Sequence, residues 1–306
     1  MTEPAHRCGF VSIAGRPNAG KSTLLNALIG EKLAITAHQP QTTRTSIQGV
    51  LTTPRSQIIF IDTPGIHKSN TLFNQRMMGT VRGALQDRDL VLYVADASRP
   101  ATEEDEHAVS AVEHSAKALL VLNKIDRIED KRLLLPLIEN WMKMFTFADA
   151  VPVSARKSEG IEELKRVIEK HLPEGPAVFP EDYLTDQPMR FLAAEIIREQ
   201  ILHAIREEVP HATAILIESW EEAPRLVRIA ATIHVERPGQ KIILIGNKGQ
   251  MLKTIGSQAR AELERMLGRK VFLSLFVKVK PNWREDPAFL DSVDWRSMIG
   301  SEDKQQ

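Results

Sequence analysis

The sequence predicts a mainly parallel α/β domain wrapped by helices, followed by a smaller α+β domain. In the first half of the chain, short continuous apolar runs alternate with helical segments, as in parallel sheets whose strands are buried on both faces. In the second half, a helix precedes a strand of alternating polarity and a second amphipathic helix. We expect domains at residues 7–172 and 189–281, a proline-rich linker at 173–188 and a tail at 282–306.

The composition excludes several classes of protein. The formal net charge of the 306 residues is zero, which gives no whole-chain argument for binding nucleic acid or membrane. Cys8 is the only cysteine, so no disulfide can form within the chain, and a reducing cytosol is the simplest setting. No apolar run approaches the ~20 residues of a membrane span, and the nine histidines show no paired metal-ligand spacing. We therefore expect a cytoplasmic protein without a zinc site.

A glycine loop follows the first predicted strand, Gly9–Ala14, and precedes the first predicted helix, Lys21–Gly30. It reads Gly15-Arg16-Pro17-Asn18-Ala19-Gly20-Lys21-Ser22, with Thr23 next. This G-x-x-x-x-G-K-S spacing is typical of the loop that cradles phosphates in nucleoside triphosphatases. Glycines let backbone N–H groups approach the phosphates, and the helix adds its positive N-terminal end. We expect Lys21 to reach the β- and γ-phosphates and Ser22 to ligate Mg²⁺.

The other elements of the first half follow from apolar runs and helical periodicity. Strands are predicted at Ser56–Asp62, Asp89–Asp96, Lys117–Asn123 and Ala150–Ser154, and helices at Thr102–His114, Asp130–Met144 and Gly160–His171. Ligands collect at the carboxyl ends of parallel strands, so polar motifs at these ends are candidate site residues.

Three motifs stand at such strand ends. The first is Asp62-Thr63-Pro64-Gly65, in which Asp62 can hold Mg²⁺ through water and the Gly65 N–H can sense a γ-phosphate. The second is Asn123-Lys124-Ile125-Asp126, the N-K-x-D signature of guanine recognition, because a carboxylate can accept from both the ring N–H and the exocyclic amino group of guanine. The third is Ser154-Ala155-Arg156, a loop whose backbone can approach the base.

Together with the glycine loop, these motifs resemble the translation-factor class of GTPases. The resemblance makes Glu31–Arg44 a switch loop in which Gln41-Thr42-Thr43-Arg44 matches the second motif; we favour Thr43 as a Mg²⁺ ligand, with Thr42 as the alternative. It also makes Lys21, Thr43 and Gly65 the residues closest to the reaction. Ile66 stands where Ras-like proteins carry the glutamine that orients water, which implies slow intrinsic hydrolysis. Asn18 matches GTPases in which this residue helps to hold K⁺.

The second half begins with a helix at Met189–Glu208 and two strands at Ala212–Trp220 and Arg225–Val235. Glu221, Glu222 and Pro224 suit the hairpin loop between these strands. A helix is then predicted to end at Leu267 before Gly268, and a last strand at Val271–Val279. The tail after Pro281 is expected to be extended, with Trp283 and Trp295 packing it down.

A second glycine motif, Gly246-Asn247-Lys248-Gly249, lies between these elements. It is the G-x-x-G of a KH domain, which clamps nucleic-acid backbone. From Lys241 to Lys280 there are nine basic residues and two acidic ones, an electrostatic footprint for phosphates to which Lys241, Lys248 and Lys253 contribute. The order α-β-β-α-α-β resembles the type II KH fold, and this makes Lys241–Ile245 a short helix although its β-branched residues favour a strand.

The whole chain resembles the Era family of bacterial ribosome-assembly GTPases. The matching segments include G-R-P-N-A-G-K-S, Q-T-T-R, D-T-P-G-I, N-K-I-D, F-L-A-A-E-I-I-R-E and I-L-I-G-N-K-G. The resemblance implies binding of GTP and GDP with Mg²⁺, of the 3′ end of 16S rRNA and of the immature 30S subunit, with peripheral association at the inner membrane; we expect a monomer. Two other functions remain open: a P-loop kinase for a small substrate, and a GTP-controlled adaptor whose second domain binds protein.

Overall fold

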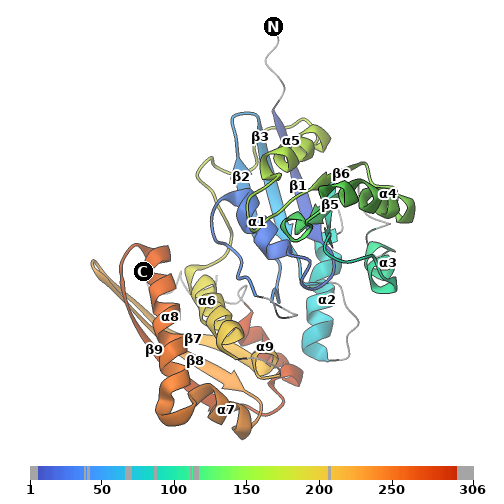
Figure 1. Ribbon diagram of the computed structural model, residues 1–306. Helices are drawn as coiled ribbons and strands as arrows, with labels where there is room; N and C mark the ends of the chain where they lie inside the picture. Colours follow the sequence, from blue (N-terminus) through green and yellow to red (C-terminus); the bar gives the residue numbers. More distant parts are fainter. Residues whose placement is uncertain are drawn as a thin grey trace. The chain divides into compact units, whose positions relative to one another are not determined.

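The computed structural model describes residues 6–37, 39, 42–65, 71–85, 88–110, 112, 117–205 and 208–294 (Figure 1). The chain divides into two compact units. The first comprises Met1–Asn70 and Asn74–Asp186, and the second comprises Thr71–Phe73 and Gln187–Gln306. Each unit has its own buried core, and the two are described separately below.

The first unit is built on a six-stranded sheet with the strand order β2-β3-β1-β4-β5-β6. All neighbouring pairs are parallel except β2 and β3, which confirms the mainly parallel sheet predicted from the sequence. The strands are β1 (Arg7–Ala14), β2 (Ile47–Thr52), β3 (Ser56–Asp62), β4 (Leu90–Asp96), β5 (Ala118–Asn123) and β6 (Asp149–Pro152).

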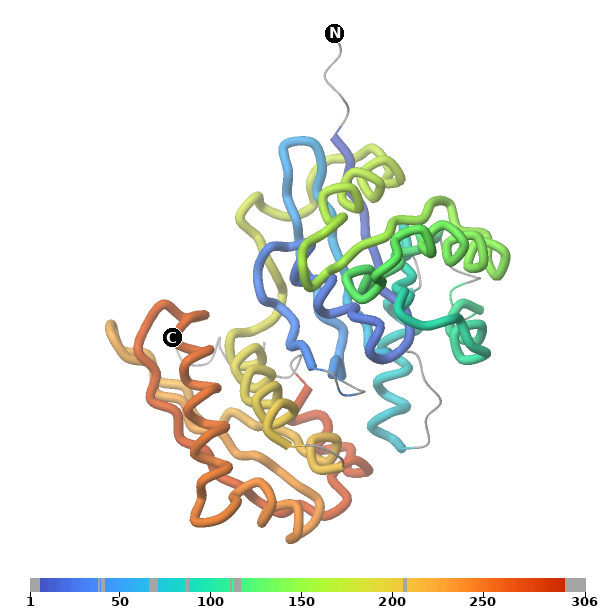
Figure 2. The backbone as a smooth tube through the Cα atoms, viewed as in Figure 1, coloured from blue at the N-terminus to red at the C-terminus, as the bar shows by residue number. Residues whose placement is uncertain are grey.

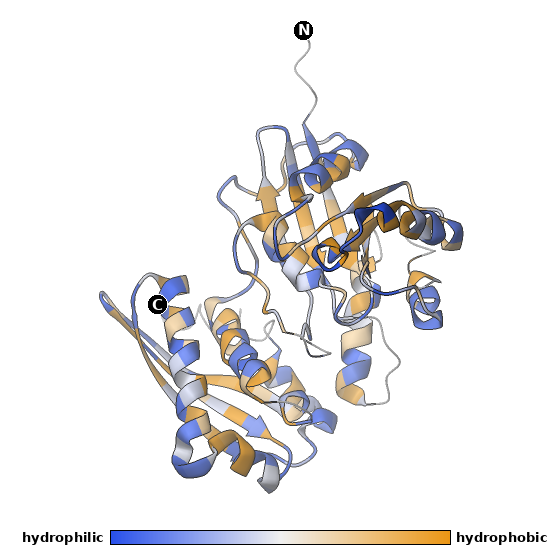
Figure 3. Ribbon diagram, viewed as in Figure 1, coloured by the Kyte–Doolittle hydropathy of each residue, from blue (hydrophilic) through white to orange (hydrophobic). Residues whose placement is uncertain are grey.

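Helices cover both faces of this sheet. Buried side chains of α1 (Lys21–Ile29) and α5 (Ile161–His171) join the core on one face, and those of α2 (Leu72–Leu85), α3 (Glu103–Ser110) and α4 (Leu134–Met144) join the core on the other. Apolar residues concentrate on the strands between these layers (Figure 3). The helices leave the carboxyl ends of β1, β3 and β5 uncovered, and the motif residues lie at these ends.

Two elements of the first unit were not predicted from the sequence. Strand β2 has only a short apolar pattern interrupted by Gly49, and it forms because it pairs antiparallel with β3. Helix α2 contains Gly79 and Gly83, which lower helix propensity, and it buries few apolar side chains. Packing against the rest of the unit decides both elements.

The proline-rich segment after α5 is fastened to the edge of the sheet, beside β2 and β3 (Figure 2). The fully buried Gln57 side chain accepts hydrogen bonds from the N–H groups of Val178 and Phe179 at 2.8 and 2.9 Å and donates one to the Phe179 carbonyl at 2.9 Å. Further along, the Val50 N–H donates to the Leu184 carbonyl at 2.8 Å. We call residues 173–186 the strap, because they hydrogen-bond to β2 and β3.

The second unit has a three-stranded sheet with helices on one face. Its strands β7 (Thr213–Ala223), β8 (Leu226–Val235) and β9 (Lys270–Val279) have β8 in the centre, antiparallel to β7 and parallel to β9. With the helices α6 (Met189–Ala204), α7 (Pro238–Ile245) and α8 (Gln250–Leu267), the order is the α-β-β-α-α-β expected for a type II KH fold. Figure 1 shows α6 and α8 lying over the sheet.

Three local predictions in this unit need comment. The 240s segment is a helix, as the family resemblance implied, because Pro238 begins it and Gln240 bonds back to the N–H groups of Glu236 and Arg237. The predicted hairpin loop was wrong in detail: Glu221 and Glu222 belong to β7, and the turn is the tighter Pro224–Arg225.

The predicted extended tail was also wrong up to Val293. It forms a short helical turn, η5 (Trp283–Glu285), and helix α9 (Pro287–Val293). Trp283 is fully buried, and its indole N–H donates to the Ala212 carbonyl at 3.0 Å. The remaining tail, with Trp295, lies outside the described residues.

Candidate functional site

The glycine loop turns between β1 and α1 with backbone angles that need glycine. Gly15 and Gly20 have φ of 142° and 98°, and a Cβ atom at Gly15 would lie 2.4 Å from the Val94 carbonyl oxygen. Lys21 begins α1 and is buried, and its ammonium donates to the carbonyls of Gly15 and Arg16 at 3.0 and 2.9 Å. Burial lowers the pKa of Lys21 to about 8, although the Asp62 carboxylate nearby opposes this shift. A bound phosphate would compensate the buried charge.

Three oxygen-bearing side chains from separate elements meet beside Lys21. Ser22 Oγ donates to Asp62 Oδ2 at 2.7 Å and lies 2.6 Å from Thr43 Oγ1, which is itself 3.2 Å from Asp62 Oδ2. The other carboxylate oxygen, Asp62 Oδ1, is buried and has no hydrogen-bond partner among the described residues. Burial raises the pKa of Asp62 to about 6. Hard oxygen ligands with one unsatisfied buried carboxylate oxygen fit Mg²⁺ or its water ligands.

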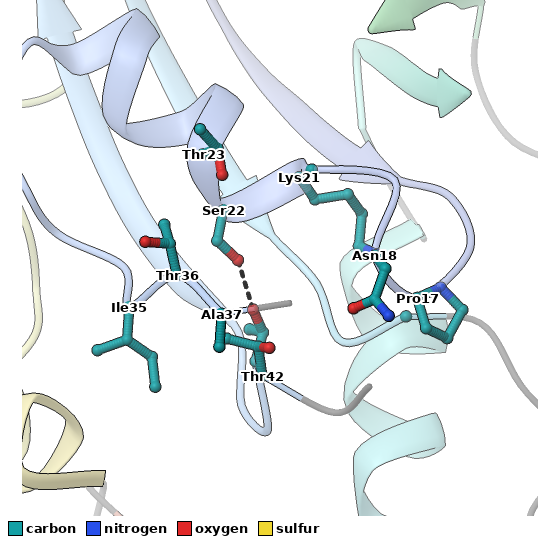
Figure 4. Close-up of a pocket in the computed structure, with 12 residues that line it drawn as sticks. Pro17, Asn18, Lys21, Ser22, Thr23, Ile35, Thr36, Ala37 and Thr42 are labelled. Atoms are coloured by element: carbon teal, nitrogen blue, oxygen red, sulfur yellow. Dashed lines mark hydrogen bonds between the residues drawn. The ribbon is translucent and has the colours of Figure 1, made fainter. Parts of the chain in front are cut away.

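The structure also distinguishes the two threonines left open by the sequence. Thr43 is buried at the Ser22–Asp62 pair, whereas the Thr42 hydroxyl donates to the Gln39 carbonyl at 2.7 Å. Figure 4 shows Lys21 and Ser22 at the start of α1, with Ile35, Thr36 and Ala37 on the loop across the pocket. Gly65 lines the same pocket, and a Cβ there would come within 2.7 Å of the Pro17 nitrogen. Gln41 and Ile66 lie outside the described residues.

The residues predicted to recognise the base converge on a second part of the glycine loop. The Asn123 amide donates to the Ala19 carbonyl at 3.0 Å, and its oxygen accepts from the Ala155 N–H at 3.0 Å. Ser154 Oγ donates to Asp126 Oδ1 at 2.7 Å, which lowers the pKa of Asp126. Asp126 is therefore an ionised acceptor held in place by Ser154, as guanine recognition requires. The side chain of Arg156 is exposed, so only its backbone fits the predicted role.

Two sets of ion pairs that were not identified from the sequence hold the glycine loop in place. The Arg16 guanidinium pairs with Asp105 at 2.8 Å and with Glu104, both on α3, so its side chain is committed there. Lys124 pairs with Asp96 at 2.6 Å and donates to the Asn18 carbonyl at 2.5 Å. Since Arg16 and Asn18 both belong to the loop, it is anchored at two points. Asp96 ends an apolar strand, as Asp62 does, and this signal could have identified it.

The Gly246–Gly249 loop joins α7 to α8 in the second unit. Gly246 has φ 70° and ψ −178°, and a Cβ there would lie 2.6 Å from Met251 Cβ. Lys248 and Gly249 have positive φ values of 48° and 79°. The Lys248 side chain is exposed, as is that of Lys253 one turn into α8, whereas Lys241 is half-buried. Beside the loop is a pocket lined by residues of α6 and α8, among them His203, Met251 and Thr254.

Comparisons with known proteins identify both domains. A family model described as "50S ribosome-binding GTPase" matches residues 10–124, and one described as "KH domain" matches residues 208–284. GTPase Era of Geobacter metallireducens is 46% identical over 298 residues, which cover 96% of this chain and all of that protein. GTPase Era of Geotalea uraniireducens is 47% identical over 292 residues, covering 95% and 98%.

The chain belongs to the Era family of GTPases.

Solved Era structures share the whole fold. Era in complex with MgGDPNP and nucleotides 1506–1542 of 16S ribosomal RNA has a TM-score of 0.92 and 40% identity, covering 95% of this chain and 99% of that one. A variant of Aquifex aeolicus Era bound to GDP·AlF4⁻ has a TM-score of 0.91 and 40% identity, covering 94% and 99%. The chain is thus a GTPase. No helix among the described residues is long and apolar enough to span a membrane.

Proposed function

We propose that this protein is a GTP-hydrolysing switch that binds the 3′ end of 16S rRNA through its second unit during assembly of the small ribosomal subunit. The observation that carries the proposal is that one chain combines the Ser22–Asp62 and Ser154–Asp126 contacts expected of a guanine-nucleotide site with a positive-φ G-x-x-G loop. The related Era structure with MgGDPNP and 16S rRNA nucleotides supports both halves of it.

The chemistry at the nucleotide site is mainly electrostatic. Ser22, Thr43 and Asp62 would hold Mg²⁺, which supplies charge neutralisation at the β- and γ-phosphates. Lys21 already donates to the loop's own carbonyls, so exchanging these for phosphate oxygens needs only a small movement of its ammonium. Asp126 and Asn123 orient the base, and the Gly65 N–H would respond to the γ-phosphate. Ile66 offers no side chain to orient water, and we therefore expect slow intrinsic hydrolysis.

The specificity of the site can be tested by exchanging nucleotides. Asp126→Ala should remove most of the preference for guanine over adenine nucleotides, by up to about 10⁴-fold, because the half-buried carboxylate is the main discriminating acceptor. Titrations of the wild type and the variant with fluorescent GTP and ATP analogues measure this preference. A wild type that bound adenine nucleotides as tightly as guanine nucleotides would contradict the assignment and favour the kinase alternative.

Coupling between nucleotide and RNA is the second part of the proposal. The γ-phosphate orders the switch loop around Thr43 and the segment after Gly65, and this state favours RNA binding; by reciprocity, RNA then changes nucleotide affinity by the same factor. Dissociation constants for the 16S rRNA 3′ segment should therefore differ between GDP and a GTP analogue. Gly249→Asp should abolish RNA binding, because it places a negative charge on the loop that would contact phosphates. It should spare GTP hydrolysis, and a Cβ at Gly249 meets no atom within 4 Å. RNA binding that survives this change would favour the adaptor alternative.

Several finer expectations accompany the proposal. Asn18 has φ 63°, and its backbone carbonyl accepts a hydrogen bond from Lys124. We expect the Asn18 side chain to help hold K⁺, as the resemblance to related GTPases implies. Equal hydrolysis rates in sodium and potassium buffers would exclude this role. Action on the immature 30S subunit and peripheral contact at the inner membrane follow from the family resemblance alone. A cytoplasmic location also agrees with the single cysteine, and we expect a monomer.

A further inference from the structure

One face of strand β9 presents two phenylalanines between two lysines. Alternate residues of β9 pack into the core beneath the helices, among them Val271 and Val277. The intervening residues point to the opposite face of the sheet: Lys270, Phe272, Ser274, Phe276 and Lys278. The phenylalanines are 58% and 57% exposed, which is unusual for side chains of this size. We call these five residues the β9 row.

The C-terminal helix covers this face of the sheet only at its far end. There, Phe289 of α9 lies edge-on against His234 of β8, with ring centroids 4.9 Å apart, and Ala214 of β7 joins the same small core. In the register of the sheet, His234 pairs with Lys278, whereas Phe272 and Phe276 pair with Arg228 and Thr232 further along. The two phenylalanines therefore stay exposed among the described residues.

The charges around the β9 row suit a phosphate backbone. Lys270 lies 3.7 Å from Glu264 and Lys278 lies 3.9 Å from Glu218, and these separations exceed hydrogen-bond distance. Exposed pairs of this kind are weak and exchange easily for another anion. Arg228 adds a third cation beside Phe272, although the acidic Glu221 stands opposite Arg228 in the register of β7 and β8. The electrostatic attraction is modest, so stacking on the rings must supply most of the affinity.

We propose that the β9 row is a second RNA contact, on which unpaired bases stack outside the Gly246–Gly249 loop. Phe272 and Phe276 are four residues apart on one strand, about 13 Å at the usual rise per residue, so each ring can take a separate base. Aromatic side chains on a rigid sheet with flanking cations are a recurrent way to hold single-stranded RNA. The proposal rests on the proposed binding of rRNA and extends it to a surface on the opposite side of the sheet from α7 and α8.

Two other occupants fit the β9 row less well. A second copy of the chain could pair with β9, which is an edge strand, but lysines near both ends of an edge strand oppose such pairing. A lipid surface favours a continuous apolar face, whereas Ser274 separates the two rings here.

The experiment compares two double variants of the full-length protein with the wild type. Phe272→Leu with Phe276→Leu keeps apolar side chains and removes the rings, while Phe272→Tyr with Phe276→Tyr keeps the rings. Binding of labelled RNA corresponding to nucleotides 1506–1542 of 16S rRNA is measured with a GTP analogue present. We expect the leucine variant to bind about tenfold or more weakly and the tyrosine variant to bind like the wild type, with RNA-free GTP hydrolysis unchanged in both.

The outcomes separate this inference from the proposed function. If Gly249→Asp abolishes RNA binding but the leucine variant binds like the wild type, the β9 row is not an RNA contact and the proposed function stands. If the wild type binds no RNA in any nucleotide state, both are wrong. Unchanged RNA affinity together with loss of vesicle binding or of a dimer in the leucine variant would assign the row to a lipid surface or to self-association and overturn the proposal.

Discussion

Replacing Gln57 by leucine tests whether the strap is a structural part of the first unit. The change keeps the size of the side chain and removes its amide, which makes three hydrogen bonds to the strap and a fourth to Thr52 Oγ1 at 3.1 Å. A hydrogen bond of this kind contributes about 1 kcal/mol net, so the expected loss in the free energy of unfolding is about 2–4 kcal/mol, the lower value applying if water replaces the amide at the strap. Gln57 is fully buried, and a leucine there adds no cavity.

Urea denaturation of the full-length protein measures the loss, and limited proteolysis locates it. Tyr183, whose ring stacks on that of Phe179 with centroids 4.5 Å apart in the strap, is a chymotrypsin site that should become accessible when the strap detaches. Val178→Ala is the matched control, because this side chain is 59% exposed and should change the free energy of unfolding by less than about 0.5 kcal/mol. Equal stability and equal cleavage rates in wild type and Gln57→Leu would show that the strap contacts contribute nothing and refute the reasoning.

Three further predictions concern the two functional sites. Asp105→Asn should weaken GTP and GDP alike by about tenfold in fluorescent-nucleotide titrations, because Arg16 loses the buried carboxylate that anchors the glycine loop; an unchanged affinity would mean that the anchor has no effect on binding. Without nucleotide or Mg²⁺, the pKa of Asp62 is about 6 in the folded protein and about 4 in the unfolded chain. The free energy of unfolding of the wild type relative to Asp62→Asn should therefore fall by up to about 3 kcal/mol as the pH rises from 4 to 6. A difference in denaturation midpoints that does not change with pH would contradict this. Gly246→Ala should weaken RNA binding because its Cβ has no room, whereas Gly249→Asn should retain the loop conformation in open space; equal RNA affinities of the two variants would remove the distinction.

The parts of the fold that the sequence predicted are those set by local pattern. Buried strands such as β4 and β5 are continuous apolar runs, and the residues at their ends were predictable because a parallel sheet brings strand ends together. The sequence therefore indicated which strand ends carry the candidate site residues, and the geometry favours Thr43 over Thr42 as the residue beside Asp62. The α7 segment shows the limit of propensity, since its β-branched residues form a helix that Pro238 begins.

The parts that were not predictable depend on partners distant in sequence. Gln57 and the strap are about 120 residues apart, and nothing in either segment alone indicates their pairing. Helix α9 forms where the tail was expected to be extended, because Trp283 and Phe289 find a small core on the open face of the sheet. Arg16 was assigned to the nucleotide from its place in the motif, but its guanidinium binds α3.

The electrostatics of the nucleotide site explain why it needs two ligands of opposite charge. Burial disfavours the charged forms of both Lys21 and Asp62, moving their pKa values toward each other, to about 8 and about 6. Each group lacks part of its compensation: the ammonium is bonded to neutral carbonyls, and Asp62 Oδ1 has no hydrogen-bond partner among the described residues. A phosphate alone would satisfy the lysine and repel the aspartate, whereas a cation alone would do the reverse. A nucleotide carrying its own Mg²⁺ meets both requirements, so metal and phosphate should bind cooperatively to this site.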